Sequence, residues 1–419
     1  MRFLHAADLH LDSPLRGLDR YEGAPVERLR TATRGALGAL VDRALAEPVD
    51  FVLFAGDLYD RDWQDFHTGL FFREQMVRLD RAGIRVFIAH GNHDAQGVIS
   101  RQLSLPANVT VFSSRTPETA RIDALGVAIH GRSFPDRAVG EDWVPTYPAP
   151  VAGCFNIGVL HTSLGGRPGH DTYAPTELAT LCAKGYDYWA LGHVHARELV
   201  CEAPRVVFPG NLQGRHANET GPKGCELVRV EAGRIEAEFI ALDVVRWHQV
   251  ELALDGVDTV AGLHQAFHVA LAPLRAEAAD RLLALRISLR GVSALFDLEA
   301  RQPGGLEAEL RAAAQDVTGA DVWIERVRVA LTAPFDRDAL LARDDAIGEF
   351  VRLAEAYSND LDSFKALAHA KLGGLLGGLA PELASDDIPR LDSPDELRQL
   401  LNDAEATALA RLMGAGESQ

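Results

Sequence analysis

Five short segments of the sequence carry residue types that could hold metal ions. Each follows directly on an apolar, strand-like run, and folds built on sheets place ligands in loops at the carboxyl ends of their strands. We therefore expect the five segments to meet at one edge of a sheet. They are Asp8-Leu9-His10, Gly56-Asp57-Leu58-Tyr59-Asp60, Gly91-Asn92-His93-Asp94, His161-Thr162 and Gly192-His193-Val194-His195.

The donors in these segments are carboxylates, an amide oxygen and imidazoles, without a thiolate. This set suits Mn, Fe or Zn and differs from that of a structural zinc site. In Asp8-Leu9-His10 and His193-Val194-His195 the middle residue points away, so both flanking side chains can face one ion. Two ions ~3.5–4 Å apart would activate water, orient a phosphate and neutralise the charge that develops on its oxygens. One such segment alone is usually a turn, but five in this order predict a two-metal phosphoesterase site with the ligands Asp8, His10, Asp57, Asn92, His161, His193 and His195.

The apolar runs that precede these segments predict the elements that position them. Short apolar runs alternate with helical spacing, as they do in βα units. So many strands imply a large sheet, or two sheets packed face to face with helices outside. The fold class that we expect is therefore α/β, a sandwich of two sheets flanked by helices. Helices are predicted near residues 25–46 and 67–81, and strands at 2–6, 51–55, 85–89, 127–130, 155–160, 188–191 and 205–208.

The pattern changes near residue 245 and again after Ala333-Pro334. The middle part predicts a small open α+β domain, and the last part is wholly helical, with Ser393-Pro394 at the N-cap and N1 positions of its last helix. We therefore predict a domain with the phosphoesterase site at 1–244, a cap at 245–333 and a helical tail at 334–419. The predicted strands are 247–254, 282–289 and 322–331, and the predicted helices are 257–277, 305–316, 336–357, 361–376 and 395–413.

The charge is strongly acidic and unevenly distributed. The formal net charge is −18, and residues 1–245 hold 25 Lys and Arg against 31 Asp and Glu. The remaining 174 residues hold 17 basic against 29 acidic side chains, which is a balance of −12. A protein that binds nucleic acid by neutralising phosphates is usually basic. The balance therefore argues against tight binding of DNA by this chain alone.

Composition also limits the location and the class of the protein. Hydrophobic residues make up 47% and charged residues 24%, which is typical of soluble globular proteins. The sequence has no apolar run of the roughly 18 residues that a membrane helix needs, and from its first residues we expect no leader peptide. Four cysteines without a CxxC pair predict reduced thiols. These features favour a cytoplasmic protein that is not in a membrane.

The five segments together resemble the signature of the calcineurin-like metallophosphoesterases: D-x-H, G-D-x-x-D, G-N-H-D, H and G-H-x-H, all of them unbroken here. Within that superfamily the chain resembles the SbcD-type DNA repair exonucleases, and in particular their YhaO-like bacterial branch. Two more stretches support this, His5-Ala6-Ala7-Asp8-Leu9-His10-Leu11-Asp12-Ser13-Pro14 and Pro209-Gly210-Asn211-Leu212-Gln213-Gly214-Arg215-His216. The resemblance covers roughly residues 1–240.

The resemblance implies roles for the residues of the motifs. His93 would stabilise the transition state or protonate the leaving oxygen. Asp94 would orient His93, and Asp60 would hold the loop of Asp57. The ligands would divide into one ion site of Asp8, His10 and His195, a second of Asn92, His161 and His193, and a bridging Asp57.

The resemblance also implies a function, a DNA exonuclease or endonuclease in repair that uses two divalent ions, Mn²⁺ above Fe or Zn. Its C-terminal helices would dock on an SbcC-like coiled-coil ATPase, although their apolar stripe could equally pack on the cap of the same chain. A phosphodiesterase or phosphatase acting on small nucleotides or phosphoproteins is the alternative, because the same ions hydrolyse all these esters. A scaffold without activity is a third reading, which the intact ligand set disfavours. Homodimerisation through the first segment stays open.

Overall fold

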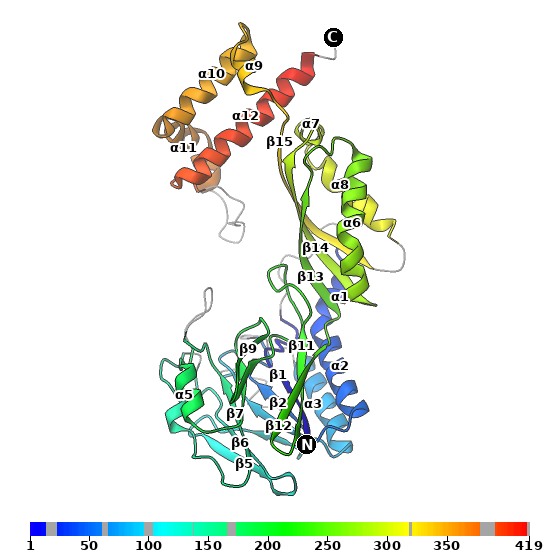
Figure 1. Cartoon of the computed structure of the whole chain (residues 1–419), viewed down its shortest axis with the longest axis vertical. Helices are drawn as coiled ribbons and strands as arrows, with labels where there is room; N and C mark the ends of the chain where they lie inside the picture. The colour runs from blue at the N-terminus through cyan, green and yellow to red at the C-terminus, as the bar shows by residue number, and fades with distance from the viewer. Residues whose placement is uncertain are drawn as a thin grey trace. The chain divides into compact units, whose positions relative to one another are not determined.

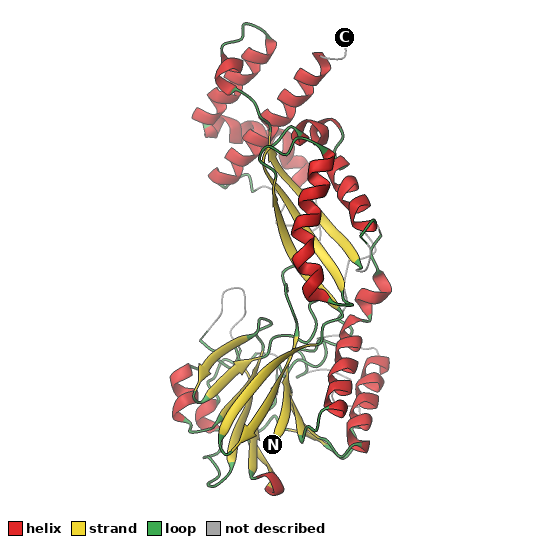
Figure 2. Ribbon diagram, turned by 45° about the vertical axis from the view of Figure 1, so that its right-hand side comes forward, coloured by secondary structure: helices red, strands yellow, loops and turns green. Residues whose placement is uncertain are grey.

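The computed structural model describes residues 1–13, 23–60, 66–95, 104–136, 138–165, 173–317, 321–377 and 390–416 (Figures 1 and 2). It divides into two compact units, which are described separately. The first consists of Met1–Gln249, Glu277–Leu285 and Gly319–Glu325, and the second consists of Val250–Ala276, Arg286–Thr318 and Arg326–Gln419.

The first unit contains two mixed, six-stranded sheets. The strand order is β12-β11-β1-β2-β3-β4 in the first sheet and β5-β6-β7-β8-β10-β9 in the second. The first sheet consists of β1 (Arg2–Ala6), β2 (Phe51–Ala55), β3 (Arg85–Ala89), β4 (Val109–Val111), β11 (Gly224–Glu231) and β12 (Arg234–Ala241). The second consists of β5 (Glu118–Ile122), β6 (Val127–Gly131), β7 (Phe155–His161), β8 (Tyr188–Gly192), β9 (Glu198–Glu202) and β10 (Arg205–Phe208).

The two sheets pack face to face around one buried apolar cluster. Phe3 and Phe51 of the first sheet stack with ring centroids 4.9 Å apart, and the ring of Tyr188 from the second sheet lies 5.3 Å from Phe3. Ile157 and Val159 of β7 belong to the same cluster. Because both faces of the central strands are covered, their sequences are continuous apolar runs rather than alternating ones.

Helices cover the outer faces of both sheets. On the first sheet, α2 (Ala32–Ala46) and α3 (Phe66–Arg81) bury side chains such as Leu37 and Phe72 against β1, β2 and β3 (Figure 1). The short helix α1 (Val26–Arg30) precedes α2, and its Leu29 packs with Val245 and Trp247 instead. On the second, α5 (Leu178–Ala183) packs Leu181 near Trp189. Short 3₁₀ helices occur at η2 (Asp123–Leu125) and η3 (Val144–Thr146). The helix predicted over 25–46 is interrupted at Thr31, so it is two helices.

A third sheet has the strand order β13-β14-β15 and is followed along the chain by helices. The helix predicted over 336–357 is also two helices, because the Asp345 side chain accepts hydrogen bonds from Ile347 N and Gly348 N and caps a new helix. The strands are β13 (Val245–Ala253), β14 (Leu282–Val292) and β15 (Val322–Thr332). The helices are α6 (Val260–Ala278), α7 (Leu295–Arg301), α8 (Gly305–Gln315), α9 (Arg337–Leu341), α10 (Ala346–Asn359), α11 (Leu361–Gly377) and α12 (Pro394–Gly416).

The predicted fold class is confirmed: two sheets flanked by helices, then a small α+β part and a helical tail. The sequence did not predict β4, β5, β9, β11 or β12. In β12, for example, charged residues alternate with half-buried apolar ones, which hides the apolar run that marks the central strands. None of the helices that the structure describes has the length and apolar character needed to cross a bilayer. The division into 1–244, 245–333 and 334–419 stays a prediction.

Candidate metal centre

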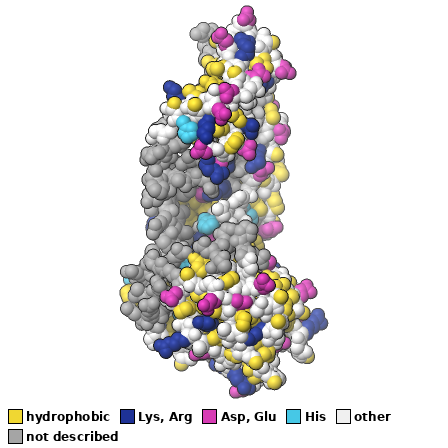
Figure 3. Space-filling view, turned by 90° about the vertical axis from the view of Figure 1, so that its left-hand side faces the viewer, with side chains coloured by type: hydrophobic (Ala, Val, Ile, Leu, Met, Phe, Trp, Pro, Cys, Tyr) yellow, Lys and Arg dark blue, Asp and Glu magenta, His cyan; other side chains and the backbone are white. Residues whose placement is uncertain are grey.

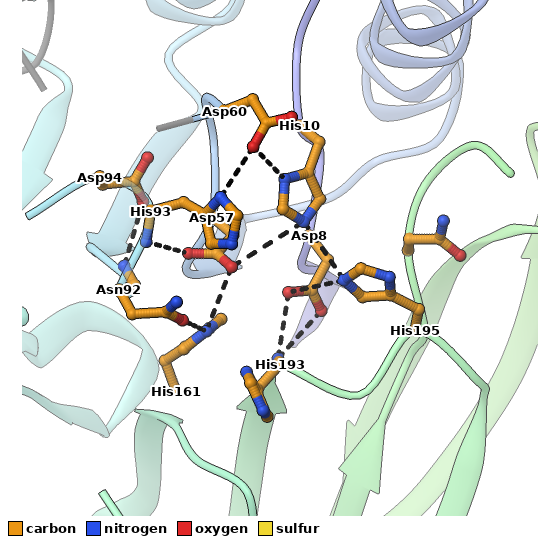
Figure 4. Close-up of polar contacts among 12 residues, drawn as sticks. Asp8, His10, Asp57, Asp60, Asn92, His93, Asp94, His161, His193 and His195 are labelled. Carbon is orange, nitrogen blue, oxygen red and sulfur yellow. Dashed lines mark hydrogen bonds and ion pairs between the residues drawn. The ribbon is translucent and has the colours of Figure 1, made fainter. Parts of the chain in front are cut away.

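The five motif segments lie at the carboxyl ends of five strands. In the first sheet, β1, β2 and β3 are parallel neighbours, and the residues that follow them carry Asp8, Asp57 and Asn92. In the second sheet, β7 and β8 are parallel neighbours, with His161 at the end of β7 and His193 just after β8. Because parallel neighbours end at the same edge, the segments meet at one place, and Figure 4 shows their side chains converging there.

Asp8, His10 and His195 form the first group of converging donors. The Nε2 atoms of His10 and His195 lie 3.2 Å apart, and His195 Nε2 is 4.0 Å from Asp8 Oδ1. These three residues offer ligand atoms that lie within 4.8 Å of one another. His10 and Asp8 are both 1% exposed. The structure thus brings together the three residues assigned to one ion by the sequence motif.

Asp57 lies between this group and a second group, which contains His161 and Asn92. Its Oδ2 atom is 3.8 Å from His10 Nε2 and 3.4 Å from His161 Nε2. His161 Nε2 is also 2.9 Å from Asn92 Oδ1, while its other ring nitrogen, Nδ1, is 2.9 Å from the carbonyl oxygen of Ala55. Such a backbone partner for the second nitrogen is typical of ligand histidines. One carboxylate oxygen of Asp57 thus faces both groups, as the predicted bridging role requires.

His193, another predicted ligand, contacts this group through its backbone. Its backbone N–H donates to both carboxylate oxygens of Asp8, at 3.1 and 3.0 Å. Its ring packs with its centroid 5.3 Å from that of His161 and 5.4 Å from that of Tyr173. Through the backbone bond His193 therefore fixes the Asp8 carboxylate, and its role as a ligand stays a prediction.

Two carboxylates next to the site exchange the roles expected for them. Asp60 Oδ1 lies 2.8 Å from His93 Nδ1, so Asp60 orients the His93 ring. Asp94 is 1% exposed, and its oxygens accept from the backbone N–H groups of Gly91, Leu58 and Tyr59 at 3.0–3.2 Å. Asp94 therefore ties the loop after β3 to the loop after β2. The prediction that Asp94 orients His93 was wrong, because the side chain points to these amides instead.

Several donors are presented by strained backbone. Asp8, His10, Asp57 and His193 have φ values of 51°, 42°, 52° and 103°, a region that residues other than glycine rarely adopt. At Gly91 a Cβ would overlap Oδ1 of Asp57, so only glycine allows the loop after β3 to approach the bridging carboxylate. The surrounding fold holds these conformations, and strain of this kind is common at functional sites.

Burial and the charges of neighbouring side chains together shift the pKa values of the donors. Burial raises the pKa of Asp8 to about 6, although His195 and His161 oppose this. Burial lowers the pKa of His10 to about 3, which keeps its imidazole neutral, the form that binds metals. For His161 burial lowers the pKa, but the charges of Asp57 and Asp8 outweigh it and raise the pKa to about 9. Burial also disfavours ionisation of Asp57, but His161 and the neighbouring histidines lower its pKa well below the usual range.

This donor set fits two divalent ions. Buried carboxylates are costly unless a cation or hydrogen-bond donor faces them, and here two carboxylates and several imidazole nitrogens face one another. Asp8, His10 and His195 would hold one ion, Asn92, His161 and His193 the other, and Asp57 both. When bound, the ions would lower the pKa of an attacking water and polarise the phosphate ester.

The sequence reasoning missed one contact of this site. Glu219 Oε1 is 2.7 Å from His195 Nδ1, and Arg215 NH2 donates to the same carboxylate oxygen at 2.9 Å. Burial opposes ionisation of Glu219, but its bond to His195 and the charge of Arg215 lower its pKa well below the usual range. No motif spacing connects positions 195 and 219, so only the position of Glu219 just beyond the 209–216 stretch could have drawn attention to it.

Comparisons with known proteins agree with this geometry. The family model for calcineurin-like phosphoesterases matches residues 1–197, and the model for the middle domain of the metallophosphoesterase YhaO matches residues 247–332. A Bacillus subtilis (strain 168) protein described as the uncharacterized metallophosphoesterase YhaO is 36% identical over 320 residues, which are 75% of this chain and 78% of that protein.

Two more distant similarities were found. The DNA double-strand break repair protein Mre11 of Methanopyrus kandleri is 26% identical over 277 residues, which are 58% of this chain and 57% of that protein. A solved structure of a dimetal phosphatase from Danio rerio shares 12% identity, covers 58% of this chain and 96% of its own, and gives a TM-score of 0.37. A structural match of that quality supports no statement about function.

The fold and the site define a calcineurin-like metallophosphoesterase, a hydrolase of phosphoesters whose family uses a dinuclear metal site. Within this class the chain belongs to the YhaO family, as its identity to the Bacillus subtilis protein and the match of its residues 247–332 establish.

Proposed function

We propose that this chain is a metal-dependent nuclease that hydrolyses phosphodiester bonds of DNA during repair. The observation that carries the proposal is the converging donor set of Asp8, His10, Asp57, Asn92, His161, His193 and His195, with His93 beside it. DNA as the substrate is supported by the similarity to the Mre11 protein, whose name refers to double-strand break repair. Mn²⁺ is the proposed ion, with Fe and Zn as alternatives.

In the proposed reaction, His93 is the group that donates a proton. His93 lies with its ring centroid 4.9 Å from that of His10, and its Nδ1 atom is held by Asp60. Because Nδ1 is engaged, Nε2 is the nitrogen available to donate a proton to the leaving oxygen of the phosphodiester. The backbone N–H of His93 donates to Asp57 Oδ1 at 2.9 Å, so the histidine is positioned by the bridging carboxylate itself.

The acidic net charge of the chain supports the proposal that a partner protein helps it to bind DNA. On the face shown in Figure 3, Lys and Arg side chains are interspersed with Asp and Glu, and the described residues visible there form no continuous basic surface. With a net charge of −18, the chain lacks the electrostatic attraction that drives DNA binding. An SbcC-like coiled-coil ATPase that docks on the helical tail would supply it. Leu353 of α10, Leu367 of α11 and Leu412 of α12 are 53%, 37% and 48% exposed and are the proposed contacts.

The nuclease proposal is tested with purified protein, Mn²⁺ and labelled double-stranded DNA, beside a His93→Ala variant. DNA cleavage by the wild-type chain, alone or with a candidate ATPase, that the variant has lost is the expected result. Cleavage of bis-p-nitrophenyl phosphate without any cleavage of DNA in either condition would favour the small-substrate phosphodiesterase. If neither substrate is cleaved with Mn²⁺, Fe²⁺ or Zn²⁺, the chain acts as a scaffold instead.

The partner proposal has its own test. Leu353→Glu and Leu412→Glu introduce charge at exposed positions of the tail, so they should abolish co-purification with the ATPase and leave hydrolysis of bis-p-nitrophenyl phosphate unchanged. Leu45→Glu, at an exposed leucine of α2 in the first unit, is the matched control and should retain the ATPase. Retention of the ATPase by both tail variants would refute docking through this surface. A cytoplasmic location and a homodimer stay predictions of the sequence.

A further inference from the structure

The loop from Asn211 to Lys223 holds His195 at two points. Glu219 Oε1 lies 2.7 Å from the Nδ1 atom of the His195 ring, on the side opposite the metal centre. Lys223 Nζ donates to the His195 carbonyl oxygen at 2.8 Å. The Glu219 and Lys223 side chains are both buried, with 7% and 6% exposure. The His195 ring is itself 21% exposed, so the contact with Glu219 contributes to its orientation.

Glu219 is in turn fixed by groups that leave it little freedom. Its Oε2 atom accepts from Asn211 Nδ2 at 2.9 Å and from the backbone N–H of Arg215 at 2.7 Å. Arg215 NH2 donates to Oε1 at 2.9 Å. A Cβ at Gly214 would lie 2.7 Å from the carbonyl oxygen of Glu219, so the loop closes tightly around this residue. Both carboxylate oxygens thus have protein donors in addition to His195.

This arrangement determines the tautomer of His195. Arg215 NH2 lies 3.2 Å from His195 Nδ1 and could only donate to it, which would require a lone pair on Nδ1. The Glu219 oxygens already accept from Asn211 and Arg215, so toward Nδ1 this carboxylate is an acceptor. The closer partner of Nδ1 is the carboxylate at 2.7 Å, and two lone pairs at that distance would repel each other. Nδ1 therefore carries the hydrogen and donates it to Glu219. The lone pair on Nε2 is then directed toward Asp8 and His10.

We propose that Glu219 is a positioning residue of the metal centre, which keeps His195 in the tautomer and orientation needed to bind the ion shared with Asp8 and His10. The inference rests on the metal centre proposed above and does not depend on DNA being the substrate. Carboxylates that accept from the second nitrogen of a ligand histidine typically change metal affinity by 10–100-fold when they are removed. The effect should be confined to one of the two ions, because Glu219 contacts His195 and not His161.

A buried carboxylate elsewhere in the same unit provides a matched control. Glu226 of β11 is 0% exposed, and its Oε1 atom accepts from Arg197 Nε at 2.6 Å. Among the described residues, its side chain forms a hydrogen bond and ion pair with Arg197, which is not a proposed ligand. Glu226→Gln therefore perturbs a buried ion pair to a similar degree and separates loss of stability from loss of metal positioning.

The test measures Mn²⁺ binding to the full chain by equilibrium dialysis, with folding of each variant checked by circular dichroism. Wild-type chain should bind two Mn²⁺. Glu219→Ala should bind one of them with unchanged affinity and the other about 10–100-fold more weakly. Glu219→Gln should show a smaller loss at the same site, because its amide oxygen can still accept from Nδ1–H. Glu226→Gln should bind both ions as the wild type does.

Each other outcome has a definite meaning. Wild-type affinity at both sites in Glu219→Ala and Glu219→Gln would overturn the inference and leave the metal centre intact. A parallel loss at both sites, matched by Glu226→Gln, would also overturn it, because it would reveal general destabilisation. If Glu219→Ala does not fold, Glu219→Gln decides. Wild-type chain that binds no Mn²⁺ would refute the metal centre itself, and with it this role of Glu219.

Discussion

At the scale of single residues, the contacts of His93 indicate a role different from that of the proposed ligands. Its ring is held by Asp60 and its backbone N–H by Asp57, while its side chain keeps 19% exposure. The proposed ligands Asp8, Asp57 and His161 are at most 2% exposed. A group that transfers a proton to a substrate must be reachable, and the exposure of His93 allows this. Burial alone does not separate it from the ligands, because the proposed ligand His195 is 21% exposed.

Replacing His93 with alanine should lower kcat on bis-p-nitrophenyl phosphate by on the order of 10²–10⁴-fold, because the proton donor is lost. Binding of Mn²⁺ should stay within threefold of the wild type, as measured by equilibrium dialysis. Asp60→Asn should lower kcat less, since it disturbs the orientation of His93 and leaves the imidazole in place. An unchanged kcat in His93→Ala would show that another group protonates the leaving oxygen.

His5 predicts a pH dependence of stability. It is 0% exposed, with Nδ1 2.9 Å from the Tyr188 hydroxyl and Nε2 3.1 Å from the Leu191 carbonyl. Burial lowers its pKa from 6.5 to about 3, so between these values the unfolded chain binds a proton that the folded chain does not. The stability that neutral His5 contributes is therefore complete above pH 6.5 and is lost as the pH falls toward 3.

Urea unfolding with a chelator present measures this effect. Between pH 7.5 and 5.5 the wild-type chain should lose about 1.4 kcal/mol more unfolding free energy than His5→Asn, which does not titrate. Equal losses in the two proteins would show that the His5 environment does not depress its pKa.

At the scale of elements, β7 and β8 illustrate how sheet pairing fixes the site. The strands run in parallel with Gly158 opposite Trp189 and His161 opposite Gly192. The Trp189 ring occupies the space where a side chain at position 158 would lie, and Trp189 is itself 0% exposed. This register brings the end of β7, with His161, level with the start of the His193–His195 loop.

Gly158→Ala should therefore destabilise the chain by about 1–3 kcal/mol, because the new methyl group overlaps the buried indole ring. Denaturant unfolding measures the change in the free energy of unfolding. Any loss of Mn²⁺ affinity would show that the pairing of β7 with β8 affects the position of the proposed ligands. Gly38→Ala is the control: nothing lies within 4 Å of its added Cβ in α2, and alanine favours helix. A Gly158→Ala protein as stable as the wild type would contradict the packing described for these strands.

At the scale of the whole molecule, the metal centre links two sheets whose sequences are far apart. Asp8, Asp57 and Asn92 follow strands of the first sheet, while His161 and His195 come from the second. Ions shared between them bind the folded chain only, because the unfolded chain does not bring these donors together. Metal binding should therefore stabilise the sandwich as a whole.

Removal of metal with EDTA should lower the midpoint of thermal unfolding, and Mn²⁺ should restore it. At a free Mn²⁺ concentration 100 times Kd, one site adds about 2.7 kcal/mol to the free energy of unfolding. Asp57→Ala, which removes the proposed bridge, should show little response to Mn²⁺ in the same thermal scan. A wild-type midpoint that does not respond to either treatment would contradict the metal centre.

The sequence alone predicted the central strands, the loops at their ends and the seven proposed donors, because each of these features is local. An apolar run of five residues can be read without knowing its neighbours, and so can a motif such as Gly91-Asn92-His93-Asp94. The two helices predicted as continuous are divided at single positions, Thr31 and the cap residue Asp345, and an apolar periodicity over many residues did not reveal these breaks.

Only the tertiary structure decided which partner each polar side chain takes. Asp94 follows His93 directly in the sequence and Asp60 lies 33 residues before it, yet it is Asp60 that contacts the imidazole, while Asp94 accepts from three backbone amides. The contact of Glu219 with His195 joins positions 24 residues apart, through a loop that no spacing rule describes. Local pattern fixes which groups are available, and the packing of distant segments fixes which of them meet.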